Sequence, residues 1–359
     1  VALTPTLRRI VLPEGIFIDF TLKRALSLEE DLLQRDFSIN ALALDLDSLD
    51  LPSLFLIDPK TSLEDLINKK IKLLRKESME KDPLRMLRAF RLASQLNFTI
   101  ENEITDFVKA KSFLIKKVAK ERIRDELFLI LENPLSYRYL ENPSAEILLK
   151  QTLGQNPNLE NLKRLEDILL NEGIIKKDLK KKITLHLVED ERGTRIRRDL
   201  LKFITLIFSS SQKESILSSI GKELKLGRKD IEIMKRIEKL YPRLEKTIKN
   251  KEKSLDFASF LIQAKKETVE TCLLFLTTHF HQQDFVKTLI QLLEEYFQKS
   301  DLILHPSHLI KGEELMKLLN IPAGPYISYL LDKIHQAQVR EEIRTKEEAV
   351  KYVRRVYNS

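Results

Sequence analysis

The helical character of this chain is first evident in the stretch EKDPLRMLRAFRLASQLNFTI, Glu80–Ile100. Asp82 stands where an N-cap residue would, and Pro83 fits the first helical position, because that position needs no backbone N–H donor. Apolar side chains recur near the spacing of an amphipathic helix, at Leu84, Leu87, Phe90 and Leu92. The stretch therefore predicts a helix that begins at about Asp82.

From this helix to the C-terminus the pattern stays helical. The segments ITDFVKAKSFLIKKV and KERIRDELFLIL are amphipathic, and ENPLSYRYLENPS interrupts them. Helical runs joined by Lys-rich connections follow from about residue 144, without a strict repeat period. Near the end, Thr345 and Glu348 have the spacing of a capping box and predict a final helix.

Toward the N-terminus the pattern changes to short apolar runs. FIDFTL, ALALDL and LFLID contain Phe, Ile and Leu and are bounded by Pro and Ser, as strands often are. Ser27 and Glu30 have capping-box spacing, so a short helix is expected between two of these strands, and TSLEDLINKK predicts another. Strands that alternate with short helices indicate a small α/β region.

These patterns together predict a mostly α fold. A partial α/β head is followed by a helical neck, body and tail. The predicted boundaries are 1–74 for the head, 75–143 for the neck, 144–265 for the body and 266–359 for the tail.

The composition excludes several classes of protein. Of 359 residues, 43% are hydrophobic and 32% charged, which excludes disorder throughout the chain, and only 8 Gly and 12 Pro exclude a collagen-like fibre. The single cysteine, Cys272, excludes a disulfide framework and a Cys-based zinc module, and we expect it to be a buried small hydrophobe. The longest apolar runs are too short for a spanning helix, and VALTPTLRRI does not resemble a secretory leader, so we expect a cytoplasmic protein.

Three long motifs point to one family. They are SLEEDLLQRDFSINALALDL at Ser27–Leu46, LIDPKTSLEDLINKKI at Leu56–Ile71, and the stretch at Glu80–Ile100. In this order they resemble motifs of the class II tRNA nucleotidyltransferase (CCA-adding enzyme) and bacterial poly(A) polymerase family. KERIRDEL, Lys120–Leu127, and the C-terminal segment His308–Ala349 resemble further elements of that family, so the resemblance spans nearly the whole chain.

The resemblance implies a function. Members transfer nucleotides from a nucleoside triphosphate to an RNA 3′ end, so the expected partners are tRNA, CTP and ATP, and the expected cofactor is Mg²⁺. The head is then a nucleotidyltransferase head. Two alternatives stay open: a poly(A) polymerase, which shares the motifs, and a catalytically inactive RNA-binding homologue.

The resemblance also assigns candidate nucleotide-binding residues. Arg35, Asp36 and Asn40, in RDFSINA, correspond to the ribose side of the nucleotide site, although this set could also only bridge a helix–strand turn. Asp82 and Arg85 match the family's base reader, in which a carboxylate accepts from an exocyclic amine and a guanidinium donates to ring acceptors.

The assignment includes one more arginine, and the sequence differs from the family motif at one position. Arg88 is a candidate triphosphate contact, one turn beyond Arg85. The family's Glu before the reader Asp is Lys81 here, which puts the fine geometry of the base reader in doubt.

One family feature is absent from the sequence. Members carry a G-G-x-x-R-D loop and a D-x-D pair whose carboxylates hold the metal ions, and neither occurs here in the family's position. Asp45 and Asp47 form a D-x-D, but it follows RDFSINA and is interpreted as a decoy, so no metal ligand is assigned. Asp19 matches a family strand beside the metal site and is the one catalytic candidate. Two explanations stay open: the sequence is the remainder of a longer protein, or it is a natural fragment.

Three basic clusters are candidates for RNA contact. The net charge of +8 fits either a polyanionic partner or a solvated Lys/Glu-rich surface. By resemblance, the helical body and tail bind tRNA through its shape and backbone. The candidate residues are Lys176, Lys177, Lys180, Lys181, Arg195, Arg197, Arg198, Arg228 and Lys229. Few aromatic residues lie among them, so base stacking is not the expected mode.

Overall fold

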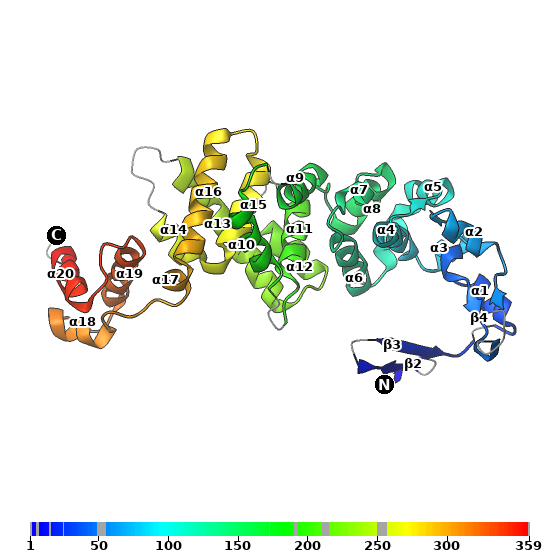
Figure 1. Ribbon diagram of the computed structural model, residues 1–359, viewed down its shortest axis with the longest axis horizontal. Helices are drawn as coiled ribbons and strands as arrows, with labels where there is room; N and C mark the ends of the chain where they lie inside the picture. Colours follow the sequence, from blue (N-terminus) through cyan, green and yellow to red (C-terminus); the bar gives the residue numbers. More distant parts are fainter. Residues whose placement is uncertain are drawn as a thin grey trace. The chain divides into compact units, whose positions relative to one another are not determined.

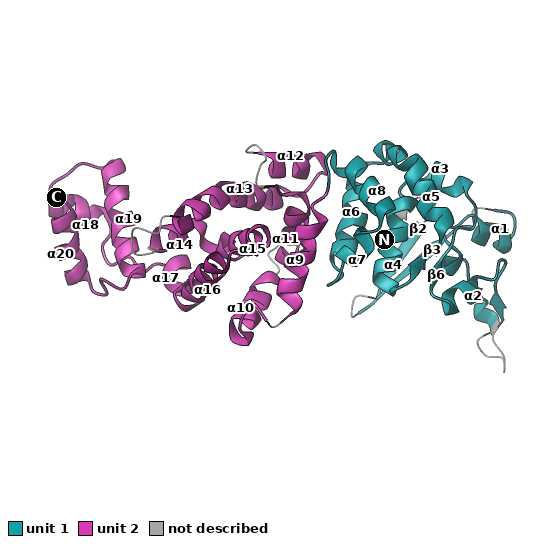
Figure 2. Ribbon diagram, turned by 90° about the horizontal axis from the view of Figure 1, so that it is seen from above, with its two compact units in different colours: residues 1–156 teal, residues 157–359 magenta. Residues whose placement is uncertain are grey.

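The computed structural model describes residues 2–4, 7–13, 16–23, 25–48, 55–171, 173–189, 193–209, 215–249 and 257–357. The chain forms two compact units, Val1–Asn156 and Pro157–Ser359 (Figure 2). The described strands all lie in the first unit, and the second is built from helices (Figure 1). The predicted fold class, mostly α with a partial α/β head, is confirmed. The four-part division of the chain stays a prediction.

An antiparallel sheet begins the first unit. Its strands are β1 (Ala2–Thr4), β2 (Leu7–Val11) and β3 (Phe17–Thr21), in the order β1-β2-β3. The register of β2 and β3 places Arg9 opposite Asp19. All five residues of β3 are exposed. Because neighbouring side chains of a strand point to opposite faces, both faces of this strand are open.

A short helix and a two-stranded sheet follow. Helix α1 (Leu28–Leu33) begins as predicted, because the Ser27 hydroxyl accepts a hydrogen bond from the backbone N–H of Glu30. The 3-10 helix η2 (Ser38–Asn40) leads to β4 (Ala43–Leu44), which pairs with β5 (Leu56–Ile57). Strand β4 is shorter than the predicted ALALDL, because η3 (Leu46–Ser48) follows it.

The next elements of the first unit lead to helix α4 (Arg85–Leu96). Helix α2 (Ser62–Ile67) is capped by Asp58, whose carboxylate accepts from the backbone N–H groups of Ser62 and Leu63. Strand β6 (Lys70–Ile71) pairs in parallel with β7 (Thr99–Ile100). Helix α3, Glu77–Lys81, ends directly before Asp82.

Helix α4 (Arg85–Leu96) is the central helix of the first unit. The four apolar residues predicted from the spacing, Leu84, Leu87, Phe90 and Leu92, are all buried. Helix α4 packs against α6 (Lys120–Leu131). The remaining helices of this unit are α5 (Asn102–Lys111), η4 (Ser112–Lys117), α7 (Tyr137–Leu140) and α8 (Pro143–Leu153).

The second unit surrounds one buried helix. Residues Thr268 to Thr277 of α15 (Thr268–Thr278) are all buried, including Cys272 as predicted. Its main neighbours are α9 (Leu159–Leu170), α11 (Arg197–Ile207), α13 (Arg228–Lys249) and α16 (Gln283–Gln298). Further helices of this unit are α10 (Lys177–Leu187), α12 (Ile216–Glu223), α14 (Ala258–Ala264), η5 (Lys265–Glu267) and α17 (Ser300–Leu304).

The last three helices share a core of their own. They are α18 (Gly312–Leu319), α19 (Pro325–Val339) and α20 (Lys346–Tyr357). Leu315, Leu330 and Val353 contribute one buried residue from each helix. The predicted capping box at Thr345 and Glu348 is confirmed by hydrogen bonds in both directions. No helix within the described ranges is long and apolar enough to cross a bilayer.

Candidate nucleotide-binding pocket

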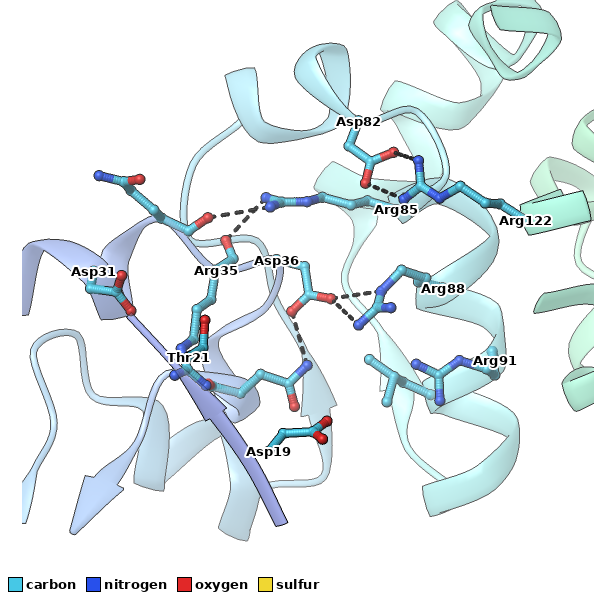
Figure 3. Close-up of a pocket in the computed structure, with 13 residues that line it drawn as sticks. Asp19, Thr21, Asp31, Arg35, Asp36, Asp82, Arg85, Arg88, Arg91 and Arg122 are labelled. Carbon is cyan, nitrogen blue, oxygen red and sulfur yellow. Dashed lines mark hydrogen bonds and ion pairs between the residues drawn. The ribbon is translucent and has the colours of Figure 1, made fainter. Parts of the chain in front are cut away.

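A pocket of about 710 Å³ opens in the first unit (Figure 3). All seven residues predicted for catalysis or nucleotide binding line it: Asp19, Arg35, Asp36, Asn40, Asp82, Arg85 and Arg88. Thr21, Asp31, Gln34, Arg91, Leu92 and Arg122 complete the lining. Residues up to 103 positions apart in sequence therefore meet in one place, between Asp19 and Arg122.

Asp36 is the most heavily bonded acid of the pocket. Its Oδ1 accepts from the backbone N–H of Phe37 at 3.0 Å and from Asn40 Nδ2 at 2.9 Å. Its Oδ2 accepts from Arg88 Nε and pairs with Nη2, both at 2.8 Å. Burial acts to raise the pKa of Asp36, but the Asn40 hydrogen bond and the Arg88 charge outweigh it and hold this pKa below its ordinary value.

Arg88 is held from a second side. Glu126 of α6 lies 3.4 Å from Arg88 Nη1 and accepts from Arg91 Nε at 2.6 Å. Glu126 is itself buried. A chain of charge pairs therefore runs from Asp36 through Arg88 and Glu126 to Arg91 and fixes these side chains relative to α4.

Asp82 precedes α4 and faces α6. Its carboxylate pairs with the Arg122 guanidinium through both oxygens, at 2.9 Å for Oδ2 and 3.3 Å for Oδ1 (Figure 3). Oδ1 also accepts from the backbone N–H of Leu84 at 3.3 Å. Helix α4 begins at Arg85 with Leu84 as its N-cap and no side-chain cap, so the prediction that Asp82 caps this helix is wrong; Asp82 instead lies on the wall of the pocket.

Arg85 crosses from α4 to the loop after α1. Its Nη1 donates to the carbonyl of Arg35 at 3.1 Å, and its Nη2 donates to the carbonyl of Gln34 at 3.2 Å. Arg35 in turn donates from Nη1 to the carbonyl of Asn40 at 3.1 Å. These contacts link the predicted base reader to the predicted ribose-side segment.

Sequence reasoning assigned no role to Arg122, which lines the pocket, or to Glu126, which pairs with Arg88 and Arg91 of its wall. Arg122 and Glu126 lie four positions apart on α6, so they share one face of the helix. The motif KERIRDEL was recognised as a family element, but no role was assigned to its side chains. The sequence does contain a signal for them, because a basic and an acidic residue lie one helical turn apart. Arg122 is opposite in charge to Asp82, and Glu126 is opposite in charge to Arg88.

Three family models match successive parts of the chain. The poly A polymerase head domain matches residues 12–72, the RNA and SrmB-binding site of polymerase A matches 97–153, and tRNA nucleotidyltransferase domain 2 matches 197–353. The chain belongs to the tRNA nucleotidyltransferase and poly(A) polymerase family. The expectation from the motifs is thereby confirmed.

Individual members of this nucleotidyltransferase family match most of the chain. The CC-adding tRNA nucleotidyltransferase of Synechocystis is 27% identical over 355 residues, which cover 98% of this chain and 81% of that protein. The CCA-adding enzyme of Streptococcus uberis is 26% identical over 348 residues, covering 93% and 74%.

Solved structures of CCA-adding enzymes share the fold. The Thermotoga maritima CCA-adding enzyme complexed with tRNA has a TM-score of 0.68 and 21% identity, covering 98% of this chain and 79% of that one. A complex of a CCA-adding enzyme with CTP has a TM-score of 0.71 and 21% identity, covering 99% and 82%.

The nucleotidyltransferase family implies a divalent metal ion, and the donors among the described residues do not form a complete site for one. No group of three or more His, Cys, Asp or Glu residues able to hold a metal occurs in the part of the chain that the structure describes. Asp19 lines the pocket, but Arg9 binds both of its oxygens, at 2.6 and 2.7 Å. This hydrogen-bonded pair lowers the pKa of Asp19. Asp45 does not line the pocket and accepts from the backbone of Asp47 at 3.1 Å.

Two of the three predicted basic clusters, the one that contains Arg195 and the one that contains Arg228, meet in the second unit. The backbone N–H of Arg195 donates to Asp230 Oδ1 at 3.0 Å, which ties the segment before α11 to the first turn of α13. Arg228 and Lys229 are exposed on that same turn. Arg198 is half-buried and pairs with Asp199 at 2.8 Å. The cluster on and before α10 is separate: Lys176, Lys177 and Lys181 are exposed and Lys180 is half-buried.

Arg197 is a correction to the predicted RNA-contacting set. Its side chain is only 3% exposed and pairs with Glu270 at 2.7 Å and with Glu267 at 3.7 Å. A guanidinium enclosed in this way cannot reach an RNA phosphate. Helix α11 is buried along nearly its whole length, which the basic pattern of its first residues does not show, so Arg197 is enclosed while Arg198 stays half-buried.

Proposed function

We propose that this chain adds C and/or A nucleotides to the 3′ end of tRNA without a nucleic-acid template. The observation that carries the proposal is the meeting of Asp82, Arg85 and Asp36 in one pocket. The chain is a transferase in which the terminal ribose hydroxyl of tRNA attacks the α-phosphorus of CTP or ATP and pyrophosphate leaves. Relatives named CC-adding and CCA-adding enzymes support this assignment.

The base reader follows from hydrogen-bond chemistry. Cytosine and adenine each present an exocyclic amine beside a ring-nitrogen acceptor, whereas uracil and guanine present a carbonyl beside a ring N–H. The Asp82 carboxylate accepts from the amine, and the Arg85 guanidinium donates to the ring nitrogen. The same two groups disfavour uracil and guanine, because the carbonyl oxygen would face the carboxylate.

The motif resemblance places Asp36 on the ribose side of the nucleotide site, but we propose that Asp36 does not contact the ribose itself. Asp36 already accepts four contacts, which is about the capacity of a carboxylate. We therefore assign Asp36 to holding Asn40 and Arg88 in place. Asn40 and Arg88 would then contact the ribose and phosphates directly.

Two surfaces of the second unit are proposed to bind tRNA. The first is the basic surface of Arg195, Arg228 and Lys229, with the α10 lysines as an additional phosphate contact. The second lies on α19 and α20, where Tyr326 and Tyr329 stack with ring centres 5.7 Å apart and Tyr357 lies 6.2 Å from Tyr326. All three rings are partly exposed, and Lys333 lies 5.5 Å from the Tyr329 ring centre. Exposed rings beside cations are suited to unpaired bases.

We propose Mg²⁺ as the divalent ion, because this cation is commonly bound through carboxylates together with substrate phosphates. Asp19 lies in the same pocket, but Arg9 binds both of its oxygens, so no described residue is assigned as a ligand of this ion. We also propose a cytoplasmic location, which fits a single buried cysteine and the tRNA substrate.

The test uses the full-length protein, Mg²⁺ and labelled tRNA that lacks its terminal C, C and A. CTP, ATP, UTP and GTP are offered singly and in pairs, and the products are sized. Addition of one to three C or A residues is expected. Long A tracts would assign a poly(A) polymerase instead, and tRNA binding without any addition would assign an inactive homologue. Asp82→Ala and Arg85→Ala should lose base choice while binding tRNA normally, with exposed Arg138→Gln as the control.

A further inference from the structure

We propose that Arg122 of α6 is a positioning residue that determines which bases Asp82 accepts. The inference rests on the proposed function and deepens it. Arg122 binds both oxygens of Asp82 and lines the same pocket. The two side chains keep 54% and 33% of their surface exposed, so a nucleotide base can approach this pair.

The contacts of Asp82 leave it a restricted acceptor. A carboxylate has about four acceptor positions, two on each oxygen. Arg122 uses one position on each oxygen, and the Leu84 N–H uses the second position on Oδ1. Among the described residues, these contacts leave one position on Oδ2. That position suits a single N–H of an exocyclic amine.

A fixed acceptor is what rejects the wrong base. Specificity requires that the carbonyl of uracil or guanine be held against an oxygen that repels it. A carboxylate that can turn about its χ2 angle relieves this repulsion and tolerates the wrong base. The two-point contact with Arg122 opposes that rotation, since a planar guanidinium matches both carboxylate oxygens at once.

Glu126 provides an internal comparison on the same helix. It lies one turn after Arg122 but binds Arg88 and Arg91, which serve the ribose and phosphate side of the pocket. Loss of Glu126 should therefore weaken the binding of every nucleoside triphosphate by a similar factor. Loss of Arg122 should instead change the ratio between correct and incorrect bases.

The experiment measures equilibrium binding of CTP, ATP, UTP and GTP to the full-length protein by calorimetry. Arg122→Gln, Arg122→Lys, Glu126→Gln, Asp82→Ala and the exposed control Arg138→Gln are compared. For Arg122→Gln, the CTP:UTP and ATP:GTP affinity ratios should fall roughly tenfold, within the range that a bidentate base contact contributes. Arg122→Lys should restore part of the ratio, because it keeps the charge but not the planar geometry.

Three results would overturn the inference. If Arg122→Gln and Arg122→Lys keep the wild-type ratios while Asp82→Ala loses them, Arg122 has no role in base choice and the proposed function stands. If Asp82→Ala keeps them as well, the base reader itself is wrong. If Arg122→Gln binds all four nucleotides more tightly and by the same factor, Arg122 only blocks Asp82. Circular dichroism and thermal melting identify any misfolded variant, in which case Arg122→Lys decides.

Discussion

The charged pocket of the first unit and a buried charge cluster of the second are both built from ion pairs between helices, but they differ in their access to water. In the pocket, Asp82 and Arg122 remain partly exposed. In the second unit, Lys202 pairs with Glu166 at 2.8 Å, and both side chains are at most 1% exposed. Arg197 and Glu270 form a similarly enclosed pair.

This difference separates charges that a ligand can reach from charges that are enclosed in the fold. Burial lowers the pKa of Lys202 against the opposing effect of Glu166, which shows the cost of enclosing that ammonium group. The two buried glutamates near Arg197 respond in opposite ways. Burial raises the pKa of Glu267. At Glu270, burial also acts to raise the pKa, but contacts from His186 and Arg197 outweigh it and lower the pKa. No RNA or nucleotide can reach such groups, so we assign them to stability.

The largest expected effect is on the stability of the second unit. Lys202→Ala leaves Glu166 buried without its ammonium partner, so the free energy of unfolding should fall by about 3–5 kcal/mol. Urea denaturation measures this change. Lys222→Ala, at an exposed position of α12, should change it by less than about 0.5 kcal/mol. A loss below about 1 kcal/mol for Lys202→Ala would contradict the assigned role.

The next effect concerns the pocket. Asp36→Asn removes a charged partner of Arg88, so CTP and ATP affinity should fall by about 2 kcal/mol, measured by calorimetry. The free energy of unfolding of Asp36→Asn should be lower than that of the wild type at neutral pH, and the two should converge in acid. Because the pKa of Asp36 is lowered in the fold, its stabilising contribution is complete above about pH 4 and is lost as pH falls through the folded pKa. In Asp36→Asn, the free energy of unfolding should therefore fall less steeply as the pH is lowered below about 4. If the free energy of unfolding depends on acid pH in the same way in Asp36→Asn and in the wild type, the assigned ion pair is excluded.

A smaller effect is expected on RNA binding. The double change Arg228→Gln and Lys229→Gln removes up to two phosphate contacts, so tRNA affinity should fall roughly tenfold at moderate salt. The slope of log affinity against log salt should decrease by about 1–2. Lys235→Gln with Lys239→Gln, further along α13, is the matched control. Equal slopes for both double variants would show that the basic surface does not contact RNA.

The smallest expected effect concerns the tyrosines of α19. Tyr329→Ala removes one stacking ring and should weaken tRNA binding by about 1 kcal/mol. Tyr329→Phe keeps the ring and should bind normally. A filter-binding titration with both variants tests this. If Tyr329→Phe is as weak as Tyr329→Ala, the hydroxyl rather than stacking explains the effect.

Local signals in the sequence were sufficient for much of the fold. Ser27 and Thr345 cap helices at the predicted positions, because capping depends on residues only three positions apart. The helical face of α4 is buried as its periodicity predicts. The seven pocket residues were also predicted, but from family motifs rather than from spacing alone.

Contacts between distant segments were beyond the reach of local patterns. Two dispersed basic clusters meet because Asp230 accepts from the backbone of Arg195. The three exposed tyrosines gather only when α19 and α20 pack together, a grouping that sequence spacing alone does not indicate.

The sequence by itself determined the helical character, two of the helix caps and the identity of the acidic and basic residues that line the pocket. Tertiary structure decided which partner each charge has. Arg122 holds Asp82, whereas Arg197, in an equally basic stretch, is enclosed by Glu267 and Glu270. The reason is physical: a charge acts through its surroundings, and burial and ion pairing depend on helices that are far apart along the chain.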